Sequence, residues 1–540
     1  MLVKITRFQM INVKCKMVFD HSKINSWDDV EEHKNEVLPY LKNDLVSMQT
    51  LMEQFSSEMY ESVGVNCVDY LTLPSLSESV HVRMLYSLNK KLTETDKKAG
   101  FNIEIPNKKK YEVIRSAIFG GRVTCYTKHF KTKIDFKNYE ELKNSGDFIY
   151  NADVSSLYPT AMVGNDLMKV AYPVGVSRFS TNPKAEFENN KLGFYEIEYE
   201  PPTNINYPAL PKRKENGGIE WNLLPGRGTY TNVDIEDAIS IGYKIKFVGS
   251  CLVYDHSRSD LFSEYVGFWY DKKAGEDLKP EDKRNMALRE IAKLMMNSLY
   301  GKTLQKAHFT NQTIINNTSE AFKFLENHHL TDLILLGNGK VLIKGEVKEI
   351  NEDDKITKPS QIGAFILSYS RRLMMMYNKI LDPTLKSVKV TYTDTDSMHI
   401  SGMDYFKLKE LELIRNGELG YLSNDIKKDG IIFEEINLGS KLYMYKYINK
   451  EEEIKTVMKC KGLPKKYLKE EFFRNEIGEI TIKDSFKKIF NQTKEEKNNN
   501  MEIFSIRKID IKRKFNKTQW SGRILKGNIY YPIGYTGEDL

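Results

Sequence analysis

Two aspartates separated by one residue are the feature of this 540-residue sequence best suited to chemistry. Asp394 and Asp396 lie in the segment Tyr-Thr-Asp-Thr-Asp-Ser, residues 392–397, with apolar and β-branched residues on both sides. This pattern predicts two strands joined by a tight turn that carries the carboxylates at its tip. Mg²⁺ prefers hard oxygen ligands and takes one or two protein carboxylates, leaving its other positions to water and phosphate. The turn therefore predicts a magnesium site, and an acidic surface turn is the simpler alternative.

A third carboxylate stands where a strand ends. Residues 147–154 form a strand pattern that contains Asp153, and an aspartate at the end of a buried strand is costly unless it is paired or bound to a metal. We therefore expect Asp153 to join the carboxylates of the turn. The loop after it offers the backbone N–H groups of Ser156 and Leu157 to a polyphosphate, and Tyr158 supplies a flat wall. The alternative is a strand with a capping aspartate and a core tyrosine.

A basic helix supplies the opposite charge. Residues 282–300 have helical periodicity, and Gly301 is expected to end the helix. Two cations, an amide and an aromatic ring recur on one face at helical spacing: Arg289, Lys293, Asn297 and Tyr300. Such a face can bind a triphosphate at one end and a base pair at the other. A solvated basic face is the alternative.

The composition sets the scale of the protein that must position these groups. At 540 residues the chain exceeds the size of one hydrophobic core, so several subdomains are expected. A net charge of +7 permits nucleic acid as a partner without requiring it. The five cysteines are scattered without metal-site spacing, and no apolar run is long enough to span a bilayer, so we expect a soluble protein of a reducing compartment with no membrane partner.

In this order, the three segments resemble motifs A, B and C of family B DNA polymerases. The matching residues are Asp-x-x-Ser-Leu-Tyr-Pro at 153–159, Lys-x-x-x-Asn-Ser-x-Tyr-Gly at 293–301 and Tyr-x-Asp-Thr-Asp-Ser at 392–397. The likeness is most specific to the protein-primed branch found in phages, eukaryotic viruses and linear plasmids. It implies an α+β, right-hand polymerase fold, with an antiparallel palm sheet, helical fingers and a thumb, preceded by a remnant of a ribonuclease-H-like exonuclease domain.

The resemblance also implies roles for the site residues. The expected reaction is DNA-dependent addition of deoxynucleotides to a 3′-hydroxyl with two Mg²⁺ ions, for which Mn²⁺ can substitute. Asp153, Asp394 and Asp396 are then the catalytic residues, with Asp153, Asp396 and Val154 at the metals. The nucleotide is expected to contact the loop and the basic helix, through Ser156, Leu157, Tyr158, Arg289, Lys293, Asn297 and Tyr300.

The same resemblance divides the chain. The expected segments are an exonuclease remnant (1–75), a linker region (76–145), palm with motif A (146–200), an insertion of the type that binds a terminal protein (201–260), fingers with motif B (261–306), a second insertion linked to processivity and strand displacement (307–360), palm with motif C (361–440) and thumb (441–540).

DNA contacts are expected at three places. Gly120, Gly121 and Arg122 would let a backbone lie close to a phosphate chain, although a hairpin turn is the alternative. Ile118-Phe119-Gly120-Gly121 stands where the family has Tyr-x-Gly-Gly, so we expect Phe119 to stack in place of the tyrosine and the single-strand contact is left open. Lys441 and Tyr443 resemble the family's KxY motif, which holds the primer terminus. Eight Lys or Arg lie between residues 501 and 526, and they include Lys512, Arg513 and Arg523; this density suits a duplex backbone.

Tyr40 and Asp44 lie one helical turn apart and resemble the third motif of the family's 3′–5′ exonuclease. The first motif is imitated only by Asp29-Val30-Glu31, which ends 13 residues before Asp44 (44 − 31), too close to form the strand it needs. One carboxylate cannot hold two metals, so we expect no proofreading by this chain alone.

The expected partners are a DNA primer-template, dNTPs and a terminal protein that acts as primer. Lys4, Arg7, Lys14 and Lys16 precede any acidic residue, a weak sign of an organellar transit segment. Mitochondrion, host cytoplasm and viral factory all stay open. A reverse transcriptase or RNA polymerase fits the motifs less well, and a catalytically decayed nucleic-acid-binding remnant is the main alternative function.

Overall fold

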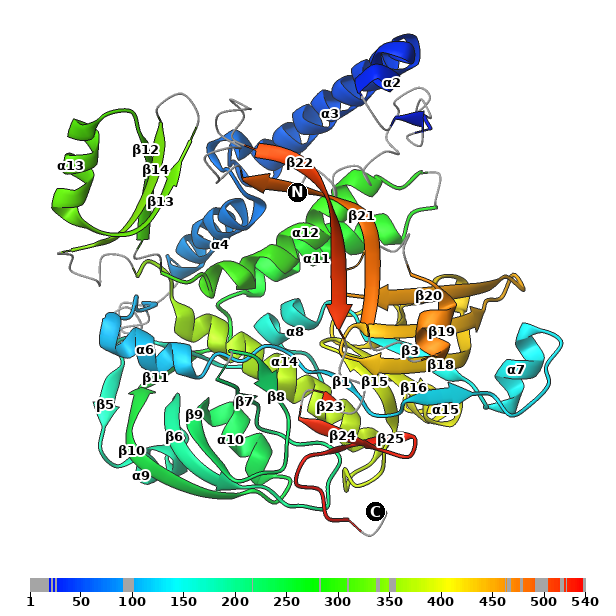
Figure 1. Cartoon of the computed structure of the whole chain (residues 1–540). Helices are drawn as coiled ribbons and strands as arrows, with labels where there is room; N and C mark the ends of the chain where they lie inside the picture. The colour runs from blue at the N-terminus through cyan, green and yellow to red at the C-terminus, as the bar shows by residue number, and fades with distance from the viewer. Residues whose placement is uncertain are drawn as a thin grey trace. The chain divides into compact units, whose positions relative to one another are not determined.

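The computed structural model describes residues 19–20, 23–24, 27–90, 102–215, 217–280, 283–307, 310–336, 340–348, 356–461, 463, 468–475, 479–490, 504–514, 519–520 and 522–537 (Figure 1). The chain forms two compact units. The first comprises Met1–Ala99, Met162–Gly164 and Arg258–Thr303, and the second comprises Gly100–Ala161, Asn165–Ser257 and Leu304–Leu540. Within the described ranges, no helix is both long enough and apolar enough to cross a membrane.

An antiparallel sheet forms the centre of the second unit. Its strand order is β1-β15-β16-β3-β18-β19-β20, and β17 and β2 pair with β3 and β18. The strands are β1 (Val123–Cys125), β2 (His129–Lys131), β3 (Ile149–Val154), β15 (Val390–Asp394), β16 (Ser397–Ser401), β17 (Leu422–Asn424), β18 (Ile431–Gly439), β19 (Leu442–Ile448) and β20 (Ile454–Cys460). Because β3 is covered on both faces, its residues form a nearly continuous buried run instead of alternating.

This sheet changes two of the expected boundaries. The region 76–145 is not a simple linker, because β1 pairs with β15 and β2 pairs with β18. The segment expected to begin the thumb at residue 441 instead supplies β19 and β20 to the central sheet. The pairings of β1 and β2 join distant segments and leave no local sequence signal, whereas β19 and β20 continue the sheet from β18 through short hairpin connections.

Helices and a 3₁₀ turn precede, connect or follow the strands of this sheet along the chain. Their bounds are α6 (Lys108–Ser116), α7 (Tyr139–Ser145), α8 (Leu157–Val163), α14 (Ser360–Leu381), α15 (Gly402–Glu410), η6 (Lys427–Asp429) and α16 (Glu470–Arg474). Helix α8 ends in residues of the first unit. Helix α14 is buried along most of its length, and it packs against α6 and α10 (Asn232–Ile239).

The expected insertion at 201–260 belongs to a larger substructure. A second antiparallel sheet has the order β5-β10-β6-β9 and begins upstream of residue 201. The elements are β4 (Tyr172–Val174), β5 (Arg178–Ser180), α9 (Pro183–Glu188), β6 (Leu192–Glu200), β7 (Lys212–Arg213), β8 (Ile219–Glu220), β9 (Gly226–Thr231), β10 (Lys244–Tyr254) and β11 (His256–Arg258). Its core is aromatic, with Tyr195, Tyr199 and Tyr230 buried beside Phe119.

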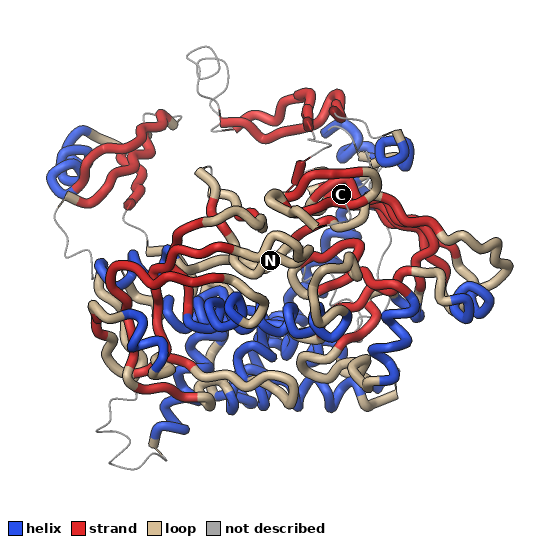
Figure 2. The backbone as a smooth tube through the Cα atoms, turned by 90° about the horizontal axis from the view of Figure 1, so that it is seen from below, coloured by secondary structure: helices blue, strands red, loops and turns tan. Residues whose placement is uncertain are grey.

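Residues 310–347 form a small sheet with its own helix. The elements are β12 (Thr310–Ile315), α13 (Thr318–Asn327), β13 (His328–Leu335) and β14 (Val341–Val347), and the strand order is β12-β14-β13. Figures 1 and 2 show α13 lying along this sheet. These elements lie within residues 307–360, for which the sequence predicts a second insertion.

The described part of the first unit is helical. It contains α2 (Trp27–Glu32), α3 (Lys34–Val63), η3 (Cys67–Asp69), α4 (Leu73–Asn89), α11 (Ser263–Asp277) and α12 (Met286–Thr303). Thr72 caps α4 by accepting a hydrogen bond from the N–H of Ser75. Helix α12 begins later than expected and continues past Gly301, so that glycine does not end the helix. Residues 1–18 of the expected exonuclease remnant lie outside the described residues.

The C-terminal region has two parts. Strands β21 (Glu479–Phe490) and β22 (Phe504–Lys514) form a long hairpin. Strands β23 (Gln519–Trp520), β24 (Arg523–Lys526) and β25 (Ile529–Pro532) form a separate sheet. This last sheet returns to the centre of the unit, because Tyr530 packs among the residues of the central sheet and Thr127 bridges to Ile529.

Candidate active site

The β15–β16 hairpin carries the two aspartates as predicted. Asp394 pairs with Ser397, so only Thr395 and Asp396 form the turn. Thr395 has φ of +68°, a left-handed conformation that is costly for a β-branched residue. Such strain persists only where the surrounding structure imposes it, and it is common at functional sites.

Strand β3 brings Asp153 to the same place. Ser397 pairs with Asp153 across β16 and β3, and the N–H of Val154 donates to the Asp396 carbonyl at 2.8 Å. The ends of two adjacent strands therefore carry Asp153 and Asp396 side by side. The pairing of β3 with β16 joins segments far apart in the sequence, but the position of Asp153 near a strand end indicated that it would join the turn.

The two aspartates of the turn have different surroundings. Burial, together with repulsion from Asp394 and Asp425, raises the pKa of Asp396 to about 6. Asp394 instead accepts two hydrogen bonds from the Lys441 ammonium, each 2.8 Å long. Asp425, which follows β17, is a further carboxylate near this site that the sequence motifs did not indicate.

The donor set fits Mg²⁺ bound together with a nucleotide. In the part of the chain that the structure describes, no three His, Cys, Asp or Glu side chains are grouped so that they alone could hold a metal. Mg²⁺ does not require such a cage, because it is commonly bound by one or two carboxylates plus substrate phosphates. Asp153 and Asp396 are the two carboxylates expected to do this, and burial raises the pKa of Asp396, which a cation bound beside it would lower again.

The loop after β3 turns sharply into α8. Ser156 has φ of +57°, and its carbonyl accepts a hydrogen bond from the N–H of Thr160 at 2.9 Å. Helix α8 then starts at Leu157, whose side chain is buried, with Tyr158 half-buried in its first turn. The expected loop is therefore present next to Asp153, and its contact with a nucleotide remains a prediction.

The basic face of α12 belongs to the first unit. Arg289 donates to Asp277 of α11 at 2.5 Å and to Glu290 at 3.0 Å, whereas Lys293 is exposed. Lys273 of α11 lies near these cations, and its burial lowers its pKa. Asn297 and Tyr300 follow along the helix and are half-buried. Lys273 was missed from the sequence, although its four-residue spacing from Asp277 within α11 was visible there.

The glycine loop differs from the expectation. The Arg122 side chain is only 6% exposed and its hydrogen bonds go to Tyr126 and Pro208, so it does not make the predicted phosphate contact. Phe119 is also buried, and its ring stacks on Tyr230 with a centroid distance of 5.4 Å. Gly120 has open space around it, whereas Gly121 packs against Thr395.

The other expected DNA contacts lie on strands or directly before one. Lys441 has φ of +58° and precedes β19, on which Tyr443 packs against Tyr392 with a centroid distance of 4.6 Å. Lys512 and Arg513 lie on β22, paired with Thr481 and Ile480.

Two further expectations concern Arg523 and the exonuclease remnant. Arg523, counted with the basic cluster, is 1% exposed and therefore unavailable to a DNA backbone. Tyr40 and Asp44 lie one turn apart on α3, and their hydrogen bond raises the pKa of Tyr40.

Comparison with known proteins places this geometry in context. Residues 14–383 match the sequence model of a family described as DNA polymerase type B, organellar and viral. A protein of Neurospora intermedia described as a probable DNA polymerase is 26% identical over 489 residues, covering 87% of this chain and 44% of that protein. A DNA polymerase of Kluyveromyces lactis is 27% identical over 465 residues, covering 80% and 40%. The chain thus spans less than half the length of these relatives.

A solved structure has the same fold. Phi29 DNA polymerase in complex with primer-template DNA and incoming nucleotide substrates matches with a TM-score of 0.62 and 18% identity, covering 95% of this chain and 78% of that chain. This likeness confirms the right-hand polymerase fold with its antiparallel palm sheet.

Proposed function

Because the chain belongs to the organellar and viral type B DNA polymerases, we propose that it adds deoxynucleotides to the 3′-hydroxyl of a DNA primer on a template. The observation that carries this proposal is the placement of Asp153 and Asp396 at the ends of adjacent strands, joined by the hydrogen bond between Val154 and Asp396. This is the arrangement that a phosphoryl transfer assisted by divalent cations requires.

The residues of the second unit have distinct proposed roles. Mg²⁺, or Mn²⁺ in its place, supplies charge neutralisation at the attacking and leaving oxygens. Asp153 and Asp396 hold the cations, with the Val154 main chain beside them, and Asp394 supports the turn through its pair with Lys441. The loop N–H groups of Ser156 and Leu157 bind phosphate oxygens, and Tyr158 packs under the sugar, where it excludes a 2′-hydroxyl.

The first unit is proposed to bind the triphosphate. Arg289 and Lys293 neutralise charge on its outer phosphates, Asn297 orients it and Tyr300 lines the nascent base pair. Lys273 adds a third cation on the facing helix. Its burial lowers its pKa, and a phosphate nearby would favour its charged form.

DNA partners and priming follow from the wider resemblance. Lys441, Tyr443, Lys512 and Arg513 are proposed to contact the primer-template, with Gly120 and Gly121 near the template strand. We propose that the 201–260 insertion binds a terminal protein whose side-chain hydroxyl is the first acceptor, as in replication of a linear plasmid or viral genome. This replication would take place in a mitochondrion, host cytoplasm or viral factory. We also propose that this chain does not proofread, because Tyr40 and Asp44 alone cannot hold two metals.

Primer extension tests the proposal. The purified chain is incubated with a primed single-stranded template, four dNTPs and Mg²⁺, beside Asp396→Ala and a matched control, Asp135→Ala, which removes an exposed aspartate. Extension by the wild type and the control, abolished in Asp396→Ala, is the expected result. Template binding without extension by the wild type would support a decayed nucleic-acid-binding remnant instead.

A further inference from the structure

The loop from Ile118 to Arg122 is held at successive carbonyl groups by arginines from other segments. Arg213 of β7 donates to the Ile118 carbonyl at 2.7 Å. Arg371 of α14 donates to the Phe119 carbonyl and also pairs with Asp234 at 2.8 Å. The loop is therefore anchored to the insertion and to α14 before the chain reaches Arg122.

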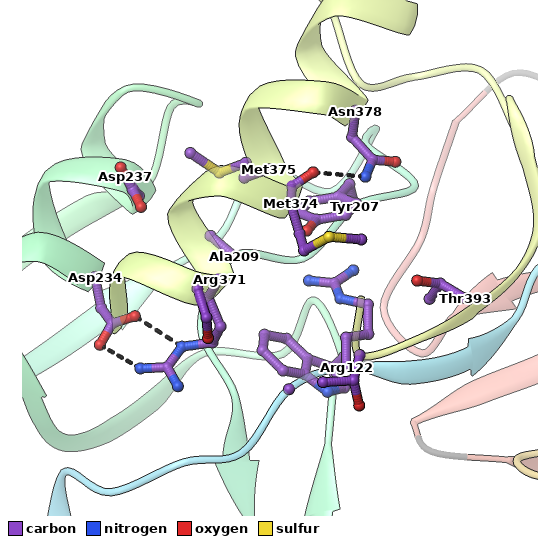
Figure 3. Close-up of a pocket in the computed structure, with 14 residues that line it drawn as sticks. Arg122, Tyr207, Ala209, Asp234, Asp237, Arg371, Met374, Met375, Asn378 and Thr393 are labelled. Carbon is purple, nitrogen blue, oxygen red and sulfur yellow. Dashed lines mark hydrogen bonds and ion pairs between the residues drawn. The ribbon is translucent and has the colours of Figure 1, made fainter. Parts of the chain in front are cut away.

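The Arg122 guanidinium is enclosed by residues of the insertion. It lies 3.6 Å from the ring centroid of Tyr207 and 4.2 Å from that of Trp221. It also donates to the Pro208 carbonyl and, at 3.2 Å, to the Tyr126 hydroxyl. Figure 3 shows Arg122 beneath Tyr207, in the pocket that Arg371 and Asp234 also line. Stacking and forked donation together fix both the plane and the direction of a guanidinium.

The main chain of this loop contacts the catalytic turn directly. The Arg122 carbonyl accepts a hydrogen bond from the N–H of Thr395 at 2.7 Å. At Gly121 a Cβ atom would lie 2.7 Å from Thr395 Cγ2, so only glycine permits this close approach. The next residue, Val123, pairs with Asp394. The left-handed Thr395 is thus held from the side of the insertion.

We propose that Arg122 is a positioning residue that fixes the Asp394-Thr395-Asp396 segment, and that it links the part of the 201–260 insertion that carries Tyr207 and Trp221 to the catalytic carboxylates. The side chain is held by the insertion, and the carbonyl of the same residue holds the turn. This role rests on the proposed polymerase function, because its effect is read in the rate of nucleotide addition.

The first test compares wild type, Arg122→Lys and Arg122→Met, with Arg227→Met as the matched control. Arg227 is 57% exposed on β9 and pairs only with surface glutamates among the contacts described. Because a displacement of about 1 Å at a reacting group can cost about 100-fold, we expect kcat to fall about 10- to 100-fold in Arg122→Met. Arg122→Lys keeps the cation between the rings and should lose less, and Arg227→Met should match the wild type.

The division between kcat and binding separates this role from DNA contact. A positioning residue lowers kcat and leaves the KM for dNTP and the Kd for primer-template within about twofold. A phosphate contact would instead weaken DNA binding and reduce its salt dependence. Weaker binding with an unchanged kcat would overturn the proposal.

A second pair of variants keeps the arginine in place. Gly121→Ala pushes directly on Thr395 and should lower kcat, whereas Thr395→Ser removes the methyl group that the new Cβ would meet. We expect Gly121→Ala to lower kcat less in the Thr395→Ser background than in the wild type. The double variant is therefore compared with Thr395→Ser, and Gly121→Ala with the wild type. If Gly121→Ala lowers kcat by the same factor in both backgrounds, the two residues act independently and the proposal is overturned. If the wild type itself extends no primer, the proposed function fails; if it extends and these variants keep its kcat, only the positioning role fails.

Discussion

Replacing Asp396 by asparagine should stabilise the metal-free protein at neutral pH and abolish its proposed activity. Burial and the neighbouring carboxylates raise the pKa of Asp396 from 3.8 to about 6. An acid whose pKa is raised by folding favours the protonated form, so the folded state is penalised once the pH exceeds the unfolded value and fully so above the folded value. At pH 7.5 the difference between 3.8 and about 6 corresponds to roughly 3 kcal/mol, and at pH 5 to about half of that.

The assay is urea-induced unfolding in EDTA at pH 7.5 and pH 5, followed by circular dichroism and tryptophan fluorescence. Asp396→Asn should raise the free energy of unfolding by roughly 3 kcal/mol at pH 7.5 and by about half as much at pH 5. Asp394→Asn is the matched control in the same turn, because it removes a partner of Lys441. Its effect should be small, within about 1 kcal/mol, because loss of the exposed pair with Lys441 and relief of the repulsion on Asp396 act in opposite directions. An Asp396→Asn variant that is less stable than the wild type at both pH values would refute this account of the site.

Three other outcomes follow from the same structure. The affinity of the protein for Mn²⁺ or Mg²⁺, measured by calorimetry, should fall as the pH drops below about 6, because a proton then competes for Asp396. An affinity that does not change between pH 7.5 and pH 5 would contradict this. Lys441→Met should tighten metal binding in the absence of DNA by about 2- to 10-fold, because it removes the cation that neutralises Asp394; calorimetry with Mn²⁺ measures this, and unchanged or weaker binding would argue against it. Arg371→Met should destabilise the protein by about 3 to 5 kcal/mol in urea unfolding, because it leaves Asp234 buried without its ion partner; the double variant with Asp234→Asn should recover part of the loss, and equal loss in both variants would exclude this cause.

Local patterns in the sequence predicted the parts of the site that a single segment determines. The β15–β16 turn and the helix carrying Arg289 to Tyr300 follow from alternation, helical spacing and turn residues. Asp153 could be assigned to a strand end for the same reason.

Contacts between distant segments were not accessible in this way. Arg122 looks like a surface cation in a glycine loop, and only the fold places Tyr207 and Trp221 around it. The pairing of Lys441 with Asp394 and the approach of Asp425 likewise depend on strands that meet across the central sheet. Gly301 fits a helix end by composition, yet α12 continues past it, since a terminal glycine is tolerated in a helix when packing favours continuation.

Because the C-terminal sheet returns to the centre of the second unit, some contacts of the central sheet can form only late in synthesis. Asn528 donates to the His129 carbonyl at 2.7 Å across 399 positions of sequence, and Arg523 stacks on Tyr126 at 4.0 Å. At about 5 to 20 residues per second, a ribosome needs roughly 20 to 80 s to make the intervening chain. During that interval the turn between β1 and β2 lacks these later partners. Tyr126, which is buried in the finished protein, therefore waits tens of seconds for these partners while the chain is being made.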